Sequence, residues 1–212
     1  GFDALHISNT GSGNEVTIRF DDQGDAYILA FISDPTKDWR SRKGLLLHSS
    51  DGLQSWDVYL LPYYMARFEK FVGNNDDFIK GPPMLLISRY FAPTEIFITI
   101  PEKQPDGTLS IPELIPVADE ALPLGAHSGE ANQAISHGDE VFIVYSKMVI
   151  LPGHTQEEGL PEYAVVYNRG TKQLSEPVFV GFGGINALDN HNWASLAAGP
   201  DGILHVLING HH

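Results

Sequence analysis

The sequence contains no cysteine in its 212 residues, which excludes a disulfide framework and any cysteine-ligated metal site. It also contains no apolar run close to the roughly 20 residues that a membrane-spanning helix needs, so we expect a soluble protein. Signatures of several enzyme classes are missing as well. There is no Gly-x-Ser-x-Gly elbow, phosphate-binding loop, His-Glu-x-x-His motif or dinucleotide fingerprint.

Basic residues are scarce. The chain has 13 lysines and arginines against 27 aspartates and glutamates, a formal net charge of −14. This charge repels nucleic acid and anionic membranes, so we expect neither as a partner. An anionic ligand would need a local cluster of positive or protonatable groups.

Turn residues, by contrast, are plentiful, and the 21 glycines and 14 prolines are typical of a turn-rich all-β protein. Short apolar runs lie between these turns and predict a series of β-hairpins. The predicted hairpins pair residues 15–20 with 26–31, 45–48 with 58–61, 96–100 with 113–116, 132–136 with 141–145, 163–167 with 178–180, and 193–198 with 203–208. Two hairpins in series make a four-stranded antiparallel unit.

Tandem units of this size predict an all-β fold of the β-propeller class, built from four-stranded antiparallel blades. We expect blades at about 14–62, 65–118 and 127–182 and a partial blade at 191–212, in one continuous segment spanning 1–212. A propeller closes its ring with about four to eight blades. The chain therefore reads as the N-terminal half of a larger propeller, with the remaining blades supplied by missing sequence or by another chain.

Histidines lie at both ends of the last predicted hairpin. Because hairpin ends meet, His191 and its neighbour Asn192 are expected near His211 and His212, where imidazoles suit proton transfer or anion binding. The same face of the propeller is expected to carry the other positive or protonatable groups of the loops, namely His127, Lys147, His154, Arg89, Arg40, Arg42 and Lys43. His205, inside the strand, is expected to be a core or inter-blade histidine, and His137 a solvated turn residue.

The stretch from His48 to Trp56 resembles a degenerate Asp-box, the turn between the third and fourth strands of sialidase-type propeller blades. Ser49, Asp51 and Trp56 match the pattern Ser-x-Asp-x-Gly-x-Thr-Trp, Ser55 stands in place of its threonine, and the glycine lies one place early. We expect a structural role, in which the carboxylate and hydroxyl cap backbone groups of the turn.

With this turn, the segment His127–Asn132, and the histidine hairpin, the chain resembles the repeat-containing propellers that include ulvan lyases and related uronic-acid-specific polysaccharide lyases. The resemblance implies cleavage by β-elimination of a uronic-acid-containing polysaccharide. It implies that His191 transfers a proton together with a tyrosine. It also implies that His211 neutralises the substrate carboxylate together with an arginine. The family's tyrosine and arginine fall beyond residue 212, so we expect them outside this segment.

Substrate-binding roles are expected for His127, Asn192, Arg89, Lys147 and His212. The elimination requires no cofactor, and the sequence leaves a structural metal open. Two other functions stay open: a non-catalytic carbohydrate-binding propeller, and a sialidase-like hydrolase, for which only scattered arginines are available. A start without methionine and the acidic, thiol-free composition favour a secreted or periplasmic protein.

Overall fold

The computed structural model describes residues 18–32, 43–63, 65–71, 80–89, 94–124, 132–184, 193–199, 201 and 203–208. Within these residues the protein consists of short β-strands and one 3-10 helix, η2 (Gln156–Glu158). The all-β fold class is thus confirmed. The assembly of the sheets into propeller blades stays a prediction.

The first sheet is an antiparallel meander in which the strand order follows the chain. Its strands are β1 (Ile18–Phe20), β2 (Ala26–Ile32), β3 (Lys43–Ser49) and β4 (Asp57–Leu60). Both predicted hairpins of this region form, with Ile28 opposite Ile18 and Val58 opposite Leu47.

The second sheet is also a four-stranded antiparallel meander, in the order β5-β7-β8-β11. Its strands are β5 (Met65–Phe68), β7 (Leu85–Arg89), β8 (Glu95–Thr99) and β11 (Ile115–Asp119). The chain leaves this sheet twice. β6 (Lys70–Phe71) joins the third sheet, and β9 (Glu102–Lys103) and β10 (Leu109–Ser110) form a separate small hairpin.

The third sheet has six strands, where a four-stranded unit was expected. The strands are β12 (Ala134–His137), β13 (Glu140–Ser146), β14 (Leu160–Asn168), β15 (Gln173–Leu174) and β16 (Val178–Gly183), with β6 added in parallel to β12. The extra strands arise because β14 pairs with both β15 and β16, and because β6 crosses over from the second sheet. The last hairpin, β17 (Ser195–Ala198) with β18 (Leu204–Leu207), forms as predicted.

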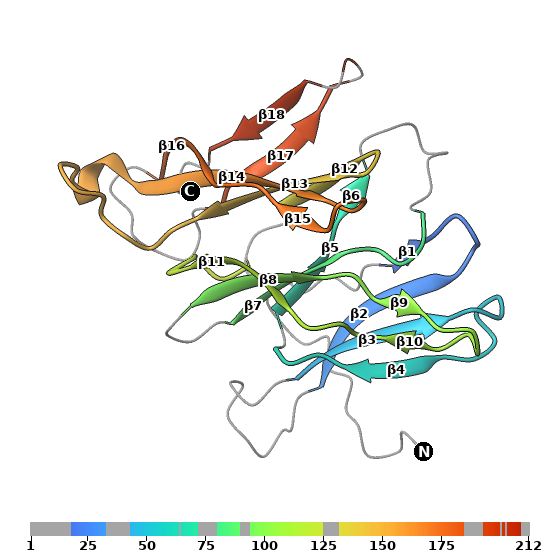
Figure 1. Ribbon diagram of the computed structural model, residues 1–212. Helices are drawn as coiled ribbons and strands as arrows, with labels where there is room; N and C mark the ends of the chain where they lie inside the picture. Colours follow the sequence, from blue (N-terminus) through green and yellow to red (C-terminus); the bar gives the residue numbers. More distant parts are fainter. Residues whose placement is uncertain are drawn as a thin grey trace.

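The sheets are stacked in chain order, from the first sheet at the bottom of Figure 1 to β17 and β18 at the top. The second sheet is therefore covered on both faces, so successive residues at the start of β7 are buried on opposite sides. Leu85 and Ile87 are buried in the core shared with the first sheet, whereas Met84 and Leu86 are buried in the core shared with the third. A strand enclosed on both sides needs a continuous apolar run instead of an alternating one.

The Asp-box-like turn has the structural role predicted for it. The Asp51 carboxylate accepts hydrogen bonds from the backbone N–H groups of Gln54 (2.9 Å) and Ser55 (3.0 Å) and from the hydroxyls of Ser49 (3.0 Å) and Ser55 (2.6 Å). These bonds, with those from Ser55 foremost, lower the pKa of Asp51 to about 2. Leu53, at the position where the pattern has glycine, adopts a left-handed φ of 71°.

The prediction that His205 is a core residue is wrong for the part of the chain that the structure describes, and the inter-blade alternative stays a prediction. β18 alternates, so that Leu204 and Val206 are half-buried while His205 and Leu207 are exposed. Position inside a strand did not imply burial, because only one face of the hairpin packs against the third sheet. His137, at the end of β12, is exposed as expected.

Candidate functional site

A row of charged residues crosses one end of the second sheet. Arg89 ends β7, Glu95 begins β8 and Asp119 ends β11, and the strand register places Glu95 directly opposite both of the others. Directly paired residues lie on the same face of a sheet, so the three side chains are neighbours. Arg89 Nη1 lies 3.1 Å from Glu95 Oε2, and this ion pair is partly exposed to solvent.

Lys147 extends this row from the third sheet. It follows β13, and its backbone is fixed by a bridge to Ala121 and by a 3.0 Å hydrogen bond from its N–H to the Pro161 carbonyl. Its Nζ lies 2.6 Å from Asp119 Oδ1. The hydrogen bond and charge of Lys147 lower the pKa of the Asp119 carboxyl, which is 74% exposed.

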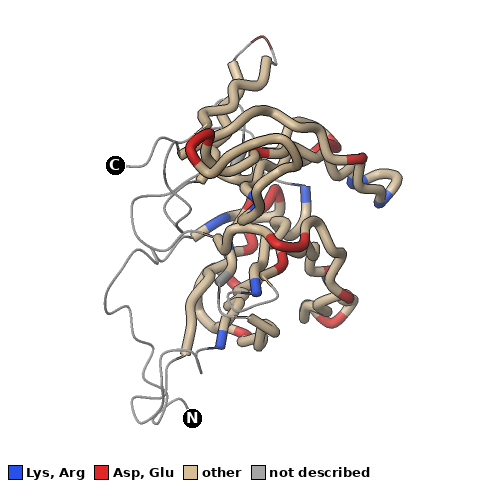
Figure 2. The backbone as a smooth tube through the Cα atoms, turned by 90° about the vertical axis from the view of Figure 1, so that its left-hand side faces the viewer, with Lys and Arg blue, Asp and Glu red and all other residues tan. Residues whose placement is uncertain are grey.

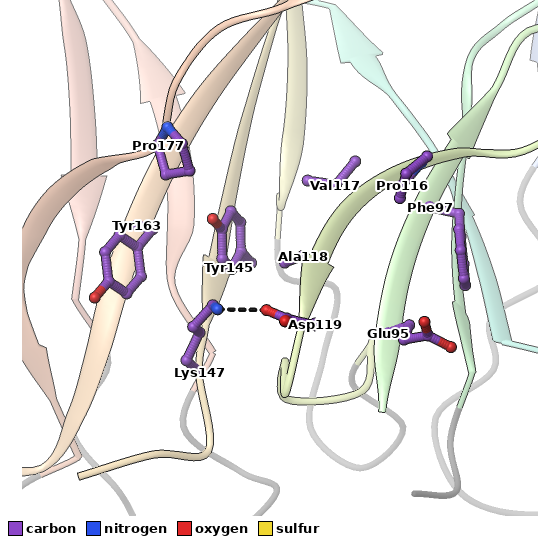
Figure 3. Close-up of a pocket in the computed structure, with 10 residues that line it drawn as sticks. All are labelled: Glu95, Phe97, Pro116, Val117, Ala118, Asp119, Tyr145, Lys147, Tyr163 and Pro177. Carbon is purple, nitrogen blue, oxygen red and sulfur yellow. Dashed lines mark hydrogen bonds and ion pairs between the residues drawn. The ribbon is translucent and has the colours of Figure 1, made fainter. Parts of the chain in front are cut away.

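A pocket of about 420 Å³ lies between these two sheets (Figure 3). Lys147, Asp119 and Glu95 supply its charged groups, and Tyr145, Tyr163 and Phe97 supply aromatic rings. Its remaining lining residues are Pro116, Val117, Ala118 and Pro177. Aromatic walls with a few polar groups are typical of small-molecule and sugar sites.

The two tyrosines of the pocket stand side by side on neighbouring strands. Tyr145 in β13 is directly paired with Tyr163 in β14, and their rings stack at a centroid distance of 5.8 Å and an interplanar angle of 20°. Burial, together with the nearby Tyr163 and Asp119, raises the pKa of Tyr145 to about 12. Its hydroxyl is therefore protonated at neutral pH and is suited to hydrogen bonding, not to acting as a base.

The sequence-predicted site residues are only partly covered by the structure. Lys147 lines the pocket. Arg89 does not line it but forms an ion pair with Glu95, which does. The remaining predicted site residues lie outside the described residues: His127, His191, Asn192, His211 and His212.

The expected concentration of positive charge on this face stays a prediction, because Arg40, Arg42 and the histidines just named lie outside the described residues. Three of the members that the structure describes have acidic neighbours. Arg89 and Lys147 are each paired with a carboxylate, Glu95 and Asp119, so the four charges cancel. His154, which sequence reasoning placed on the same face, has its Nδ1 3.0 Å from Glu158 Oε1. In Figure 2 the described lysines and arginines lie at separate places along the backbone.

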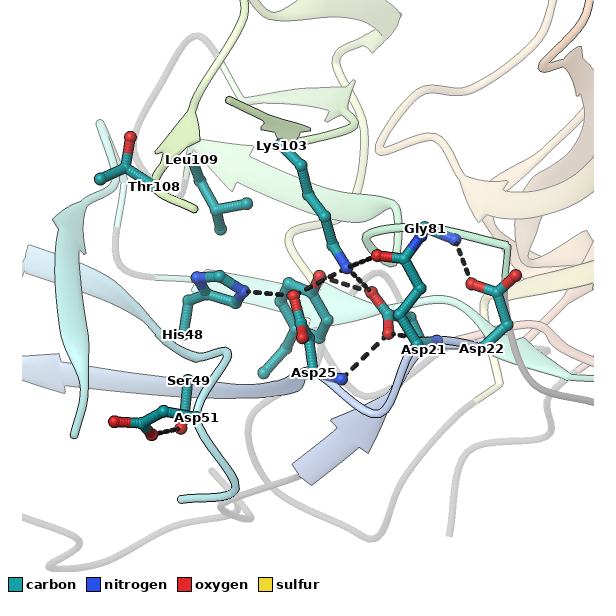
Figure 4. Close-up of polar contacts among 12 residues, drawn as sticks. Asp21, Asp22, Asp25, His48, Ser49, Asp51, Gly81, Lys103, Thr108 and Leu109 are labelled. Carbon is teal, nitrogen blue, oxygen red and sulfur yellow. Dashed lines mark hydrogen bonds and ion pairs between the residues drawn. The ribbon is translucent and has the colours of Figure 1, made fainter. Parts of the chain in front are cut away.

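Sequence reasoning missed the polar cluster at the turn between β1 and β2 (Figure 4). The Nζ of Lys103, in β9, lies 2.7 Å from both Asp21 Oδ2 and Asp25 Oδ2. Asp21 also accepts the Tyr27 hydroxyl at 2.8 Å, and Asp25 lies 3.1 Å from His48 Nε2. Burial alone would raise the pKa of Asp21, but the hydrogen bonds from Lys103, Tyr27 and the backbone lower it. Each of these side chains is paired with a described neighbour, so we assign the cluster a structural role.

A similar contact joins the second and third sheets. Arg169, after β14, forms an ion pair with the fully buried Glu69, whose carboxylate also accepts the Met84 N–H at 2.8 Å. The two partners are 100 residues apart, and no local pattern marks either of them.

Glu162 is the second fully buried glutamate. One carboxylate oxygen accepts the Ser146 hydroxyl at 2.7 Å, while the other is buried without a hydrogen-bond partner among the described residues. Burial raises the pKa of Glu162 to about 7, although the bond from Ser146 acts in the opposite direction. Ser146 and Glu162 are paired next to Tyr145 and Tyr163, so they lie on the opposite face from the pocket.

Across the ranges described, no three histidine, aspartate or glutamate side chains are grouped as metal ligands. None of the helical segments in those ranges has the length and apolar character needed to cross a bilayer. Comparison with known proteins assigns no family, since neither a protein-family model nor a curated protein matches the sequence.

Proposed function

We propose that this chain is part of a β-propeller polysaccharide lyase that binds a uronic-acid-containing chain and cleaves it by β-elimination. The observation that carries the binding half of the proposal is the pocket between the second and third sheets. There Lys147 lies beside the stacked rings of Tyr145 and Tyr163, and the Arg89–Glu95 pair lies at the edge. Three separate stretches of sequence thus provide groups that suit one anionic sugar.

The chemistry of these groups fits a uronate. The half-buried ring of Tyr163, backed by Tyr145, offers apolar surface to the C–H groups of a sugar, and carboxylates accept its hydroxyl protons. Lys147 is the cation for the uronate carboxylate. Its present partner Asp119 is 74% exposed. Such an ion pair contributes only about 0.2–1 kcal/mol, so a ligand carboxylate can replace Asp119 at small cost.

The catalytic half of the proposal depends on His191 and His211, at the ends of the last hairpin, and on the resemblance of this hairpin to uronate-specific lyases. In β-elimination a neutralised carboxylate makes the C5 proton more acidic, a base removes that proton, and an acid protonates the departing 4-O oxygen. Imidazoles serve as a base when neutral and as a counter-charge when protonated. Tyr145 is a poor substitute for the base, since its pKa is raised to about 12.

A non-catalytic carbohydrate-binding propeller is the second candidate. It is favoured by the charge balance at the pocket, where both cations already have acidic partners. A site of this kind recognises hydroxyl groups as readily as carboxylates, and such recognition requires no chemistry.

Binding to matched polymers tests the pocket. In isothermal titration calorimetry, Lys147→Met is expected to lose about tenfold in affinity for polyglucuronate oligosaccharides, because a hydrogen bond to a charged group contributes about 1.5–3 kcal/mol. Affinity for a neutral glucan of equal length should change little. Lys172→Met is the control, since that lysine is 74% exposed and lies outside the pocket. Equal affinity of native protein and Lys147→Met for the uronate would reject the assignment of Lys147.

A further inference from the structure

A β-bulge in β16 brings two phenylalanines to the same face of the third sheet. Glu162 is paired with Gly181, and the next residue of β14, Tyr163, is paired with Phe179, so Val180 has no partner in the ladder. Residues three apart in a regular strand point to opposite faces. The one extra residue reverses this alternation, and Phe179 and Phe182 therefore both lie on the side of Tyr163.

Five rings follow one another from the pocket to the surface. Tyr145 contacts Tyr163, and Tyr163 contacts Phe179 with centroids 5.8 Å apart in both pairs. Phe179 then contacts Phe182 at 5.1 Å, and Phe182 contacts His154 at 4.6 Å. We call Tyr145, Tyr163, Phe179, Phe182 and His154 the aromatic row.

Exposure to solvent differs along the aromatic row and is greatest in its middle, since Tyr163 and Phe182 are half-buried and Phe179 between them is exposed. Tyr145 is 1% exposed, whereas Phe179 is 47% exposed. The row therefore begins inside the pocket and continues onto open surface, and its inner members are pocket-lining residues. Single exposed apolar side chains are common on proteins. A bulge that aligns two of them with the rings of a pocket is a more specific arrangement.

We propose that the aromatic row is an extended binding platform for a polysaccharide chain whose terminal or internal sugar occupies the pocket. Successive sugar rings would stack their C–H faces on Tyr163, Phe179 and Phe182. This inference rests on the proposed carbohydrate-binding function of the pocket. It goes further by assigning rings outside the pocket to the neighbouring sugars of that chain and by giving the direction in which the chain leaves the pocket.

Two properties follow from stacking as the mode of binding. Stacking of a sugar on an aromatic ring depends little on the charge of the substituents at the edge of the sugar. The platform therefore adds affinity for neutral and acidic chains alike. The gain depends on chain length, because a disaccharide held in the pocket does not reach the outer rings. Charge selectivity would stay with Lys147.

Calorimetry with oligosaccharides of ulvan from two to eight sugars long tests the platform in the 212-residue chain. Phe179→Ala and Phe182→Ala are each expected to weaken binding of the octasaccharide about fivefold and to leave binding of the disaccharide unchanged. Phe179→Leu, which keeps an apolar side chain but removes the ring, should show the same loss with a native thermal melt. Val178→Ala is the matched control, since Val178 is 63% exposed in the same strand.

The outcomes separate the platform from the proposed function. Native affinity of Phe179→Leu and Phe182→Ala for the octasaccharide would overturn the platform while leaving the pocket in place. A second outcome is that the native protein binds neutral glucan and uronate octasaccharides equally well, and that the same variants lose binding to the neutral one. This outcome would support the platform and reject uronate specificity. A native protein that binds neither polymer rejects both. A concentration-dependent dimer in sedimentation velocity that is abolished by Phe179→Ala would assign the row to self-association and would also overturn the platform.

Discussion

Lys103 and Asp21 connect two parts of the chain that no local pattern relates: the Lys103 ammonium lies 2.7 Å from a carboxylate whose side chain is fully buried. Lys103 belongs to the small hairpin that follows β8, and Asp21 belongs to the turn between β1 and β2. The first sheet and the extension of the second are thus held together by charge as well as by their shared apolar core.

Lys103→Met should therefore destabilise the protein. The Asp21 carboxylate would keep its bonds from Tyr27 and the backbone but lose its only described cation. Because the Lys103 side chain is partly exposed, we expect the loss to cost about 1–3 kcal/mol. Urea unfolding measures the effect. Lys172→Met removes an exposed pair with Glu102 at 3.5 Å and should change the free energy of unfolding by less than about 1 kcal/mol. Equal effects of the two substitutions would contradict this prediction.

Two substitutions in the Asp-box-like turn should act in opposite directions. Leu53 is 47% exposed and holds a left-handed φ of 71°, which costs a non-glycine residue about 1 kcal/mol. Leu53→Gly should raise the melting temperature slightly, since little packing is lost. Asp51→Asn should lower it, because the carboxylate that accepts four hydrogen bonds is gone. A lower melting temperature for Leu53→Gly would show that the side chain matters more than the backbone conformation.

Glu162 should make the protein less stable as the pH rises. Its pKa is about 7 in the folded protein against an ordinary value of 4.5, so between these pH values the unfolded chain releases a proton that the folded protein retains. Stability therefore falls from about pH 4.5 to about pH 7, by up to about 3 kcal/mol, and stays low above pH 7. In Glu162→Gln this contribution should vanish, leaving the variant more stable than the native protein at pH 8.

The measurement is urea unfolding at pH 5 and pH 8 for both proteins. Glu158→Gln serves as a control, since Glu158 is exposed and its hydrogen bonds from His154 and the Thr155 backbone lower its pKa. If the native protein and Glu162→Gln show the same difference between the two pH values, Glu162 does not hold a proton in the folded state.

His191→Ala tests the catalytic proposal in the protein encoded by the full coding sequence. The expected result is a loss of about 10²–10⁴-fold in the release of 4,5-unsaturated uronate from ulvan, followed by ultraviolet absorbance, with an unchanged thermal melt. His137→Ala is the control, since this exposed histidine ends β12 and is not assigned to the site. Full activity in His191→Ala would move the function to the binding-only propeller.

Local features of the fold were predictable because their causes are local. Alternating and apolar runs between glycine-rich turns gave the hairpins, and the spacing of Ser49, Asp51 and Ser55 gave a turn whose hydrogen bonds the structure shows. The pocket was only partly predictable. Lys147 was recognised as a loop cation, but Tyr145 and Tyr163 read as ordinary strand residues, because their face of the sheet depends on how the sheets stack.

Contacts between distant segments had no signal in the sequence. The partners Glu69 and Arg169 are 100 residues apart. Lys103 also donates a 2.9 Å hydrogen bond from Nζ to Gln23 Oε1, 80 residues away, so only the assembled sheets bring these residues together. The aromatic row depends on one unpaired residue, Val180, and the position of a bulge is set by the neighbouring strand. The burial predicted for His205 was wrong for a related reason, since burial of a strand residue depends on what covers its face of the sheet.

The parallel pairing of β6 with β12 has a consequence for how the protein unfolds. Lys70 and Phe71 leave the second sheet and bond to Ile135 and Ser136 of the third, so each of these sheets includes backbone from the same stretch of chain. The third sheet cannot open along this edge without breaking bonds to a segment only two residues from β5. In hydrogen exchange, the amides of both sheets would then become exposed in one cooperative event, and the stacked sheets would behave as a single unfolding unit instead of as separable repeats.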